Sequence, residues 1–316
     1  MNTSPQSETS TDIPDGYRPM NVPEGKFLAE NGPIYGWQDG DDIHLGMRIG
    51  EQHTNAGGIC HGGMSMAFAD AQLVAGAMAK MDDYTPLATI NTCVDFVRPG
   101  IVGGWFRGET KIIRSTRNLV FAEAMIFVDD ELAMRCSGVL RRLKFEPFDP
   151  DLMFQDIAPG YVGLRGESDP PEGFHLANIP GPVLDINGPL HVHLEDRNLR
   201  LGLRIEERHC NSSGVCHGGI LMMFADVQQG VGTMFKAEEF NFMPTMHMST
   251  DFAVPVRVGS WLVGETEVIR MTRNMAFSSC ILSVDGVPVV RSSGVNKRTS
   301  KSFDVVTPKT IFDLPV

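Results

Sequence analysis

Two long segments of this chain are apolar on nearly every side, and runs rich in β-branched and aromatic residues follow each of them. The first, residues 64–80, is dominated by Ala and Met and lacks Pro, so it favours a helix. The second, residues 220–236, repeats this pattern. Because a helix without a polar face must be buried on most sides, other segments have to wrap each helix.

The wrapping is predicted from four runs that follow the first helix and are separated by turn sequences such as Arg-Pro-Gly and Ser-Thr-Arg-Asn. Each half of the chain is therefore expected to form four to six antiparallel strands curled round one helix, which is an α+β fold. The predicted strands are residues 88–98, 104–115, 119–128 and 132–143, and the second half repeats them to about Arg298.

The second half of the chain repeats the first at a constant shift of 156 positions, with almost no gaps. The shift relates Trp105 to Trp261 and Glu109 to Glu265, far from any single motif. Such a long register indicates a domain duplication. Its most polar stretch is His53-Thr-Asn55-Ala-Gly-Gly-Ile-Cys-His61-Gly62-Gly63 in the first half and His209-Cys-Asn211-Ser-Ser-Gly-Val-Cys-His217-Gly218-Gly219 in the second.

This register predicts the domain organisation. The two domains are expected at residues 27–143 and 183–299, joined by a linker at 144–182 that is rich in Pro, Gly and Asp. Residues 1–26 are expected to be a disordered N-terminal tail because Ser, Thr, Pro and Asp dominate its start. Residues 300–316 are expected to be a C-terminal tail.

Composition and charge exclude some functions. The chain has 316 residues, of which 42% are hydrophobic, which is enough for two domain cores. A net charge of -12 without any Lys/Arg-rich run argues against a nucleic-acid partner. No run is long enough to cross a bilayer, so no membrane association is expected. Six cysteines without a secretory signal or CxxC spacing predict reduced thiols and a cytoplasmic protein.

Each predicted helix contains one lone carboxylate. Asp70 is the only charged residue between Gly63 and Ala79, and Asp226 occupies the same place in the second helix. Burial of an unpaired carboxylate is costly. A single Asp of this kind could simply face solvent or accept from a backbone amide. Its occurrence in both halves favours a functional role.

Helix geometry suggests where each Asp acts. Gly63 and Asp70 lie on one helix face but about 10 Å apart along the axis, so one reacting carbon cannot touch both. The free N–H groups at Gly62 and Gly63, and at the equivalent Gly218 and Gly219, would form a carbonyl-polarising site at each helix start. If the halves pack about a pseudo-twofold axis, the carboxylate of each helix can reach the start of the other. Two composite sites would result.

Other repeated polar residues have weaker interpretations. His61 and His217 could donate to a substrate, but they could equally fix the loop through backbone contacts. A zinc site is not expected, because Cys210 is replaced by Thr54 in the first half and no set of four ligands repeats. Turn residues that could contact a phosphate are Arg117, Asn118, Arg273 and Asn274, although the alternative is a solvated turn.

The pattern Asn-x-x-Gly-x-x-His-Gly-Gly, with an Asp fifteen residues after the Asn, resembles the PaaI-like acyl-CoA thioesterases of the hotdog-fold superfamily. It occurs in both halves, and the resemblance covers almost the whole of each repeat. It implies a tandem form, in which two hotdog domains pair as an intrachain pseudodimer. Two such chains would associate into an assembly of four hotdog domains, and no metal or other cofactor would be needed.

The resemblance also implies roles for residues of this chain. Asp70 and Asp226 would be base or nucleophile, Gly62 and Gly218 would polarise the thioester carbonyl, and the substrate would be an acyl-CoA. The remaining implied residues are Asn55 and Asn211, which would hold the thioester and the attacking water, and Thr89 and Thr245, which would place a hydroxyl near the carboxylate.

Two other functions remain open at this point. A non-catalytic acyl-CoA sensor or scaffold would normally have lost one or both carboxylates, whereas both are present here. A hotdog hydratase or dehydratase would have a His five residues after its Asp, and no such pair occurs around either helix. Hydrolysis of an acyl-CoA thioester is therefore favoured.

Overall fold

The computed structural model describes residues 13–22, 24–81, 85–143, 170–303 and 305–312. In this part of the chain the strands form one continuous antiparallel sheet in the order β1-β2-β3-β5-β6-β7-β4-β11-β14-β13-β12-β10-β9-β8. The first half contains β1 (Arg18–Pro19), α1 (Phe27–Glu30), β2 (Tyr35–Asp39), β3 (Asp42–Arg48), α2 (Gly62–Ala79), β4 (Leu87–Phe96), β5 (Trp105–Ser115), β6 (Leu119–Val128) and β7 (Glu131–Arg142).

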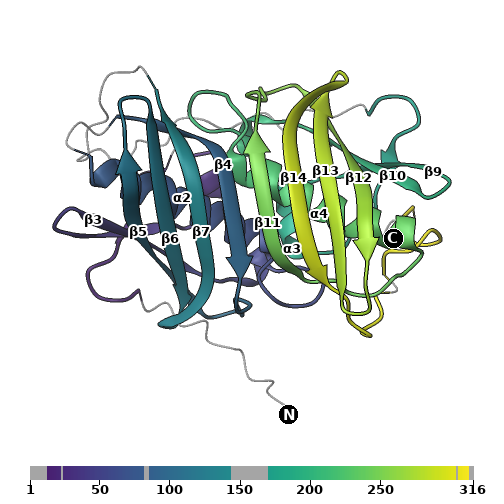
Figure 1. The fold of residues 1–316 in the computed structure, drawn as a ribbon, viewed down its shortest axis with the longest axis horizontal. Helices are drawn as coiled ribbons and strands as arrows, with labels where there is room; N and C mark the ends of the chain where they lie inside the picture. Colours follow the sequence, from purple (N-terminus) through teal and green to yellow (C-terminus); the bar gives the residue numbers. More distant parts are fainter. Residues whose placement is uncertain (1–12, 23, 82–84, 144–169, 304, 313–316) are drawn as a thin grey trace, which may run out of the picture.

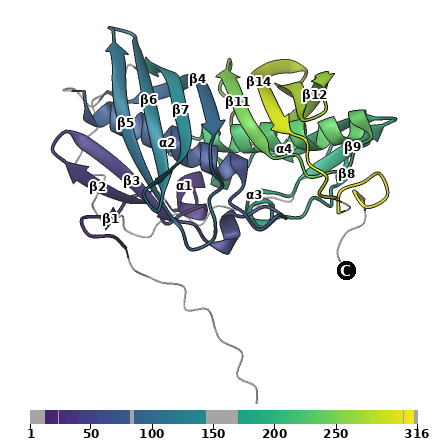
Figure 2. The same ribbon diagram turned by 60° about the horizontal axis from the view of Figure 1, so that its bottom comes forward.

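The second half repeats the same layout, and the two long helices lie on one face of the joined sheet (Figures 1 and 2). The predicted α+β fold, with an antiparallel sheet wrapped round one helix in each half, is confirmed. Its elements are β8 (His175–Leu176), α3 (Pro182–Asn187), β9 (His191–Glu195), β10 (Asn198–Arg204), α4 (Gly218–Ala237), β11 (Thr245–Phe252), β12 (Trp261–Met271), β13 (Met275–Val284) and β14 (Val287–Lys297).

A buried glutamine fixes each helix to its sheet. Gln72 of α2 is fully buried; its Nε2 donates to Ile43 O and to Thr110 Oγ1, and its Oε1 accepts from Leu45 N–H. Gln228 of α4 makes the equivalent bonds. Because a buried amide is costly unless it is hydrogen-bonded, these contacts select one position of each helix against its strands.

The two halves meet along β4 and β11, which pair antiparallel at the centre of the sheet (Figure 1). Cys93 lies opposite Ser249, its own counterpart at a shift of 156, so the pseudo-twofold axis passes between them. The side chains of Asn31 and Asn187, another equivalent pair, donate to each other over 3.0 and 2.7 Å. The chain is therefore an intrachain pseudodimer.

The helices approach each other closely at their N-terminal ends. A Cβ on Gly63 would lie 2.4 Å from the Cα of Met223 on α4, and backbone cannot move aside cheaply. We expect Gly63→Ala to lower the free energy of unfolding by about 1–3 kcal/mol, measured by urea denaturation. Gly230→Ala is the control, because a Cβ there meets no atom within 4 Å, and it should be neutral or stabilising. An equal effect of both changes would contradict this account.

The structure differs from the predicted boundaries at three places. β1 pairs with β2, so residues 13–26 are not all a disordered tail. β8 lies inside the predicted linker and pairs with β9. In the predicted C-terminal tail, Ile311 is buried and its carbonyl oxygen accepts from Asn178 N–H. These segments attach through isolated apolar anchors and edge pairing, which leave no periodic pattern in the sequence. Residues 1–12 and 144–169 lie outside the described residues.

Candidate active site

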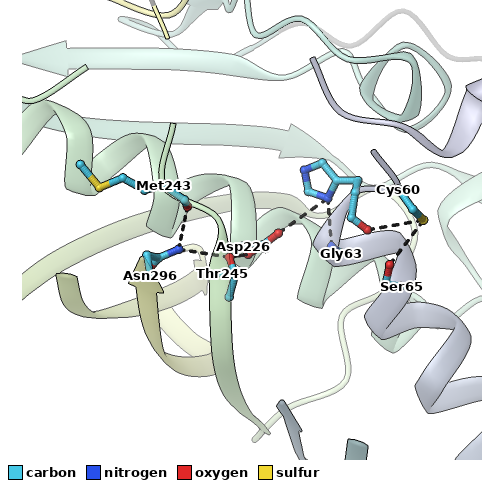
Figure 3. A network of polar contacts seen from close by, with 8 residues as sticks. Cys60, Gly63, Ser65, Asp226, Met243, Thr245 and Asn296 are labelled. Carbon is cyan, nitrogen blue, oxygen red and sulfur yellow. Dashed lines mark hydrogen bonds and ion pairs between the residues drawn. The ribbon is translucent and has the colours of Figure 1, made fainter. Parts of the chain in front are cut away.

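The carboxylate of Asp226 lies against the start of helix α2, in the opposite half of the chain (Figure 3). A Cβ on Gly62 would lie 2.8 Å from Asp226 Oδ2, so this carboxylate stands directly over the first residue of α2. On the other side of the pseudo-twofold axis, a Cβ on Gly218 would lie 3.3 Å from Asp70 Oδ2. Each carboxylate therefore faces the N-terminus of the partner helix.

A threonine holds each carboxylate in place. Thr245 Oγ1 donates to Asp226 Oδ1 over 2.7 Å, and Thr89 Oγ1 donates to Asp70 Oδ1 over 2.8 Å. We call the group formed by Asn55, His61, Gly62, Asp226 and Thr245 the Asp226 site. Its counterpart, the Asp70 site, contains Asn211, His217, Gly218, Asp70 and Thr89.

The two histidines cap the helices. His61 Nδ1 accepts from Gly63 N–H over 2.9 Å, and His217 Nδ1 accepts from Gly219 N–H over 3.0 Å. The prediction that the Gly63 and Gly219 N–H groups are available to a substrate is therefore wrong, because each already donates to the histidine two residues before it. The N–H groups of Gly62 and Gly218, at the first helical position, have no intrahelical acceptor and remain for this role.

Capping also fixes the charge of the histidines. Since Nδ1 of His61 accepts a hydrogen bond from the backbone, this nitrogen carries no proton and the single ring proton is on Nε2. His61 is therefore neutral, and its contact of 3.7 Å with Asp226 is not an ion pair. Burial lowers the pKa of His61 against the opposing effect of Asp226, and burial lowers that of His217 to about 4. Both rings are therefore uncharged donors at neutral pH.

The asparagines sit in turns of their own loops. Asn55 Oδ1 accepts from Gly57 N–H over 2.8 Å, and Asn211 Oδ1 accepts from Ser213 N–H over 2.9 Å. This leaves the NH₂ group of each side chain as the part able to donate to a ligand. Asn55 is half-buried at the cavity, whereas Asn211 is exposed.

The two carboxylates have different surroundings. Asp70 is 5% exposed, and burial raises its pKa to about 6, although the Thr89 hydroxyl acts in the opposite direction. Asp226 borders a cavity of about 460 Å³ and has a side chain that is 10% exposed. The two acidic groups therefore differ in environment, since Asp70 is buried and Asp226 is partly buried beside the cavity.

The cavity is mostly apolar and is bounded by both halves of the chain. Asn55, His61 and Gly62 lie on one side of it and Asp226 and Thr245 on the other. The apolar lining includes Phe96, Phe106 and Met134 from the first half of the chain and Val231, Met234, Phe242, Met243 and Phe303 from the second.

A further buried amide supports Thr245. Asn296, which is 3% exposed, donates from Nδ2 to Thr245 Oγ1 over 3.1 Å and to Met243 O over 3.2 Å (Figure 3). Thr245 in turn donates to Asp226, so the carboxylate is held by a chain of two donors. The equivalent residue in the first half is Leu140, which cannot donate. Hydrogen bonds in a chain polarise one another, so the Asp226 carboxylate is held more firmly.

The turn residues predicted to contact phosphate lie away from the acidic groups. Arg117, Asn118, Arg273 and Asn274 are exposed in the β5–β6 and β12–β13 hairpins and do not line the cavity. The second hairpin is nevertheless connected to the cavity wall, because Met271 packs against the cluster of Met234, Met243 and Ala276. Phosphate binding by these residues stays a prediction.

The cavity residues that sequence reasoning missed include Gly230, Asn296 and the exposed Lys297. Each differs from its counterpart in the first half, where Val74, Leu140 and Arg141 stand. A search for positions that agree between the halves cannot find them. A search for positions that differ between otherwise matching helices and strands could have singled out Gly230 and Asn296.

Comparison with known proteins agrees with this architecture. A family model described as the thioesterase superfamily matches twice, over residues 57–134 and 213–289. A Pseudomonas aeruginosa protein named a putative esterase is 39% identical over 126 residues, which are 40% of this chain and 94% of that protein.

Solved structures show the same fold at low identity. A protein with a hot dog fold from Alicyclobacillus acidocaldarius has a TM-score of 0.59 and 14% identity, and covers 86% of this chain and 98% of its own. An acyl-CoA thioesterase II from Mycobacterium marinum has a TM-score of 0.57 and 11% identity, with 83% and 95% covered.

Fold and site together define a double hotdog protein with a composite acidic site on each side of its pseudo-twofold axis. The chain belongs to the thioesterase superfamily. The predicted tandem of hotdog domains is confirmed. In the described residues, none of the helices is both long and apolar enough to span a membrane.

Proposed function

We propose that this protein hydrolyses acyl-CoA thioesters to a free acid and CoA. The observation that carries the proposal is the position of the Asp226 carboxylate, which stands over the Gly62 end of the opposite helix inside a largely apolar cavity. A thioester placed there would have its carbonyl oxygen at a helix N-terminus and its carbon beside a carboxylate. Thioester hydrolysis needs these two features and a water molecule.

In the proposed reaction the Gly62 N–H donates to the carbonyl oxygen, and this bond strengthens as negative charge develops there. Asp226 acting as a base takes a proton from water, and the resulting hydroxide oxygen bonds to the carbonyl carbon. Collapse of the tetrahedral intermediate breaks the carbon–sulfur bond, and the departing CoA sulfur takes the proton from Asp226. The Asn55 NH₂ group can hold the water or the thioester oxygen.

A second route begins with direct attack by the carboxylate. Asp226 would then bond to the acyl carbon and expel CoA thiolate, and water would hydrolyse the resulting anhydride. Single turnover in ¹⁸O-labelled water distinguishes the two routes, because only the anhydride route can leave ¹⁸O in the Asp226 side chain. In the Asp70 site, the equivalent groups are the Asp70 carboxylate, the Gly218 N–H and the Asn211 NH₂ group.

The proposal is tested by release of CoA from purified protein. A thiol reagent should detect free CoA from at least one of acetyl-, octanoyl- and palmitoyl-CoA in the presence of EDTA and without nucleotide. Protein without substrate is the control for the six cysteines, all of which are free thiols. No release above the spontaneous rate from any of these thioesters would reject hydrolysis.

A further inference from the structure

One face of α4 forms a wall of the cavity for two helical turns beyond the carboxylate. Asp226, Gly230 and Met234 all border the cavity and follow one another at intervals of four residues. At 1.5 Å per residue, Gly230 lies about 6 Å and Met234 about 12 Å from Asp226 along the axis. The wall therefore leads from the acidic group along α4 to Met234.

Gly230 opens this wall. A Cβ at Gly230 would meet no heavy atom within 4 Å, so the space beside it is not filled by protein. Gly in a helix interior costs about 1 kcal/mol relative to Ala, and here no tight contact requires it. The equivalent residue of α2 is Val74, which packs against the core. One turn beyond its carboxylate, the Asp226 site therefore has a glycine with open space beside it, where the Asp70 site has a valine.

The part of the cavity beside Met234 suits a hydrocarbon chain. Its walls are Met234, Phe242, Met243 and Phe303, and the Met side chains can adapt to irregular shapes. Two described cations border the cavity, Arg98 just after β4 and Lys297 on β14, and both are exposed. The phosphate-bearing end of a ligand would be poorly matched to the apolar residues around Met234.

We propose that the acyl chain of the substrate lies along α4 from Asp226 towards Met234, and that Gly230 gives it room, so that the Asp226 site takes medium-chain hydrophobic acyl groups. In the Asp70 site, Val74 narrows the same path. The identity of the ligand as an acyl thioester rests on the proposed function, but the direction of its acyl chain does not depend on turnover.

Binding to a non-hydrolysing protein tests this inference. The Asp70→Asn/Asp226→Asn protein is titrated by calorimetry with octanoyl-CoA and with acetyl-CoA, with and without Gly230→Val. The ratio of octanoyl-CoA to acetyl-CoA affinity should fall at least about tenfold in Gly230→Val, because the added methyl groups occupy the path of the longer chain. Thermal unfolding checks that the variant is folded, which is expected because a Cβ at this position meets no heavy atom within 4 Å.

The reverse change is the matched control. Val74→Gly should open the Asp70 site and raise its affinity for octanoyl-CoA relative to acetyl-CoA. Equal weakening of both ligands by Gly230→Val would place the pantetheine arm along α4. Unchanged affinities for both ligands would place the acyl chain beside Phe106 and Met134. Either result overturns the inference. The expected binding pattern without any CoA release by the wild-type protein would reject the proposed function alone.

Discussion

Replacement of both Asp70 and Asp226 by Asn is expected to abolish CoA release while the fold is retained. Asn has nearly the same shape as Asp and can still accept from the Thr89 and Thr245 hydroxyls, which donate over 2.8 and 2.7 Å. It cannot take a proton from water or attack a carbonyl carbon. Loss of a general base costs about 10²–10⁴-fold in rate. The measurement is the steady-state release of CoA, followed with a thiol reagent.

The single variants show how the two sites share this activity. Asp70→Asn leaves the Asp226 site complete, and Asp226→Asn leaves the Asp70 site complete, so each should retain activity that the double variant lacks. Circular dichroism of the double variant should match that of the wild-type protein. If the double variant keeps a rate within tenfold of wild type, neither carboxylate takes part in the reaction.

The composite arrangement could be predicted because the duplication supplied two copies of one geometric constraint. Asp70 is seven positions beyond Gly63 in the helix, so its carboxylate cannot reach the start of its own helix. The repeat of the same layout supplies a second helix whose start it can reach. The antiparallel strands and both buried helices followed from hydrophobic periodicity for a similar reason. Such patterns depend on many residues at once.

Contacts that depend on one side chain could not be predicted in this way. The capping bond from Gly63 N–H to His61 depends on the ring orientation, which the sequence does not fix. Asn296 supports Thr245 from a strand that is far along the chain, and its counterpart Leu140 gave no sign of the contact. Agreement between the halves revealed what the two sites share, whereas the differences that set them apart required the packed structure.

Asp70→Asn is expected to stabilise the protein at neutral pH by about 3 kcal/mol. Burial raises the pKa of Asp70 from 3.8 to about 6, and each unit of difference between folded and unfolded states corresponds to about 1.4 kcal/mol. Below pH 4 the carboxyl is protonated in both states and the change has no such effect. Between pH 4 and 6 the folded wild-type protein still holds the proton that the unfolded chain has released, so wild-type stability falls as pH rises. Above pH 6 the full difference is present.

The measurement is urea denaturation of Asp70→Asn and wild type at pH 4, 6 and 7.5. The stabilisation by Asn should be smallest at pH 4 and largest at pH 7.5. Asp130→Asn is the control, because that side chain is 90% exposed and its replacement should have little effect at any pH. A stabilisation that is the same at all three pH values would contradict the role of burial. The expected trend would show that a charged Asp70 lowers folding stability at neutral pH, a cost that a solely structural residue has no physical reason to impose in an otherwise apolar helix.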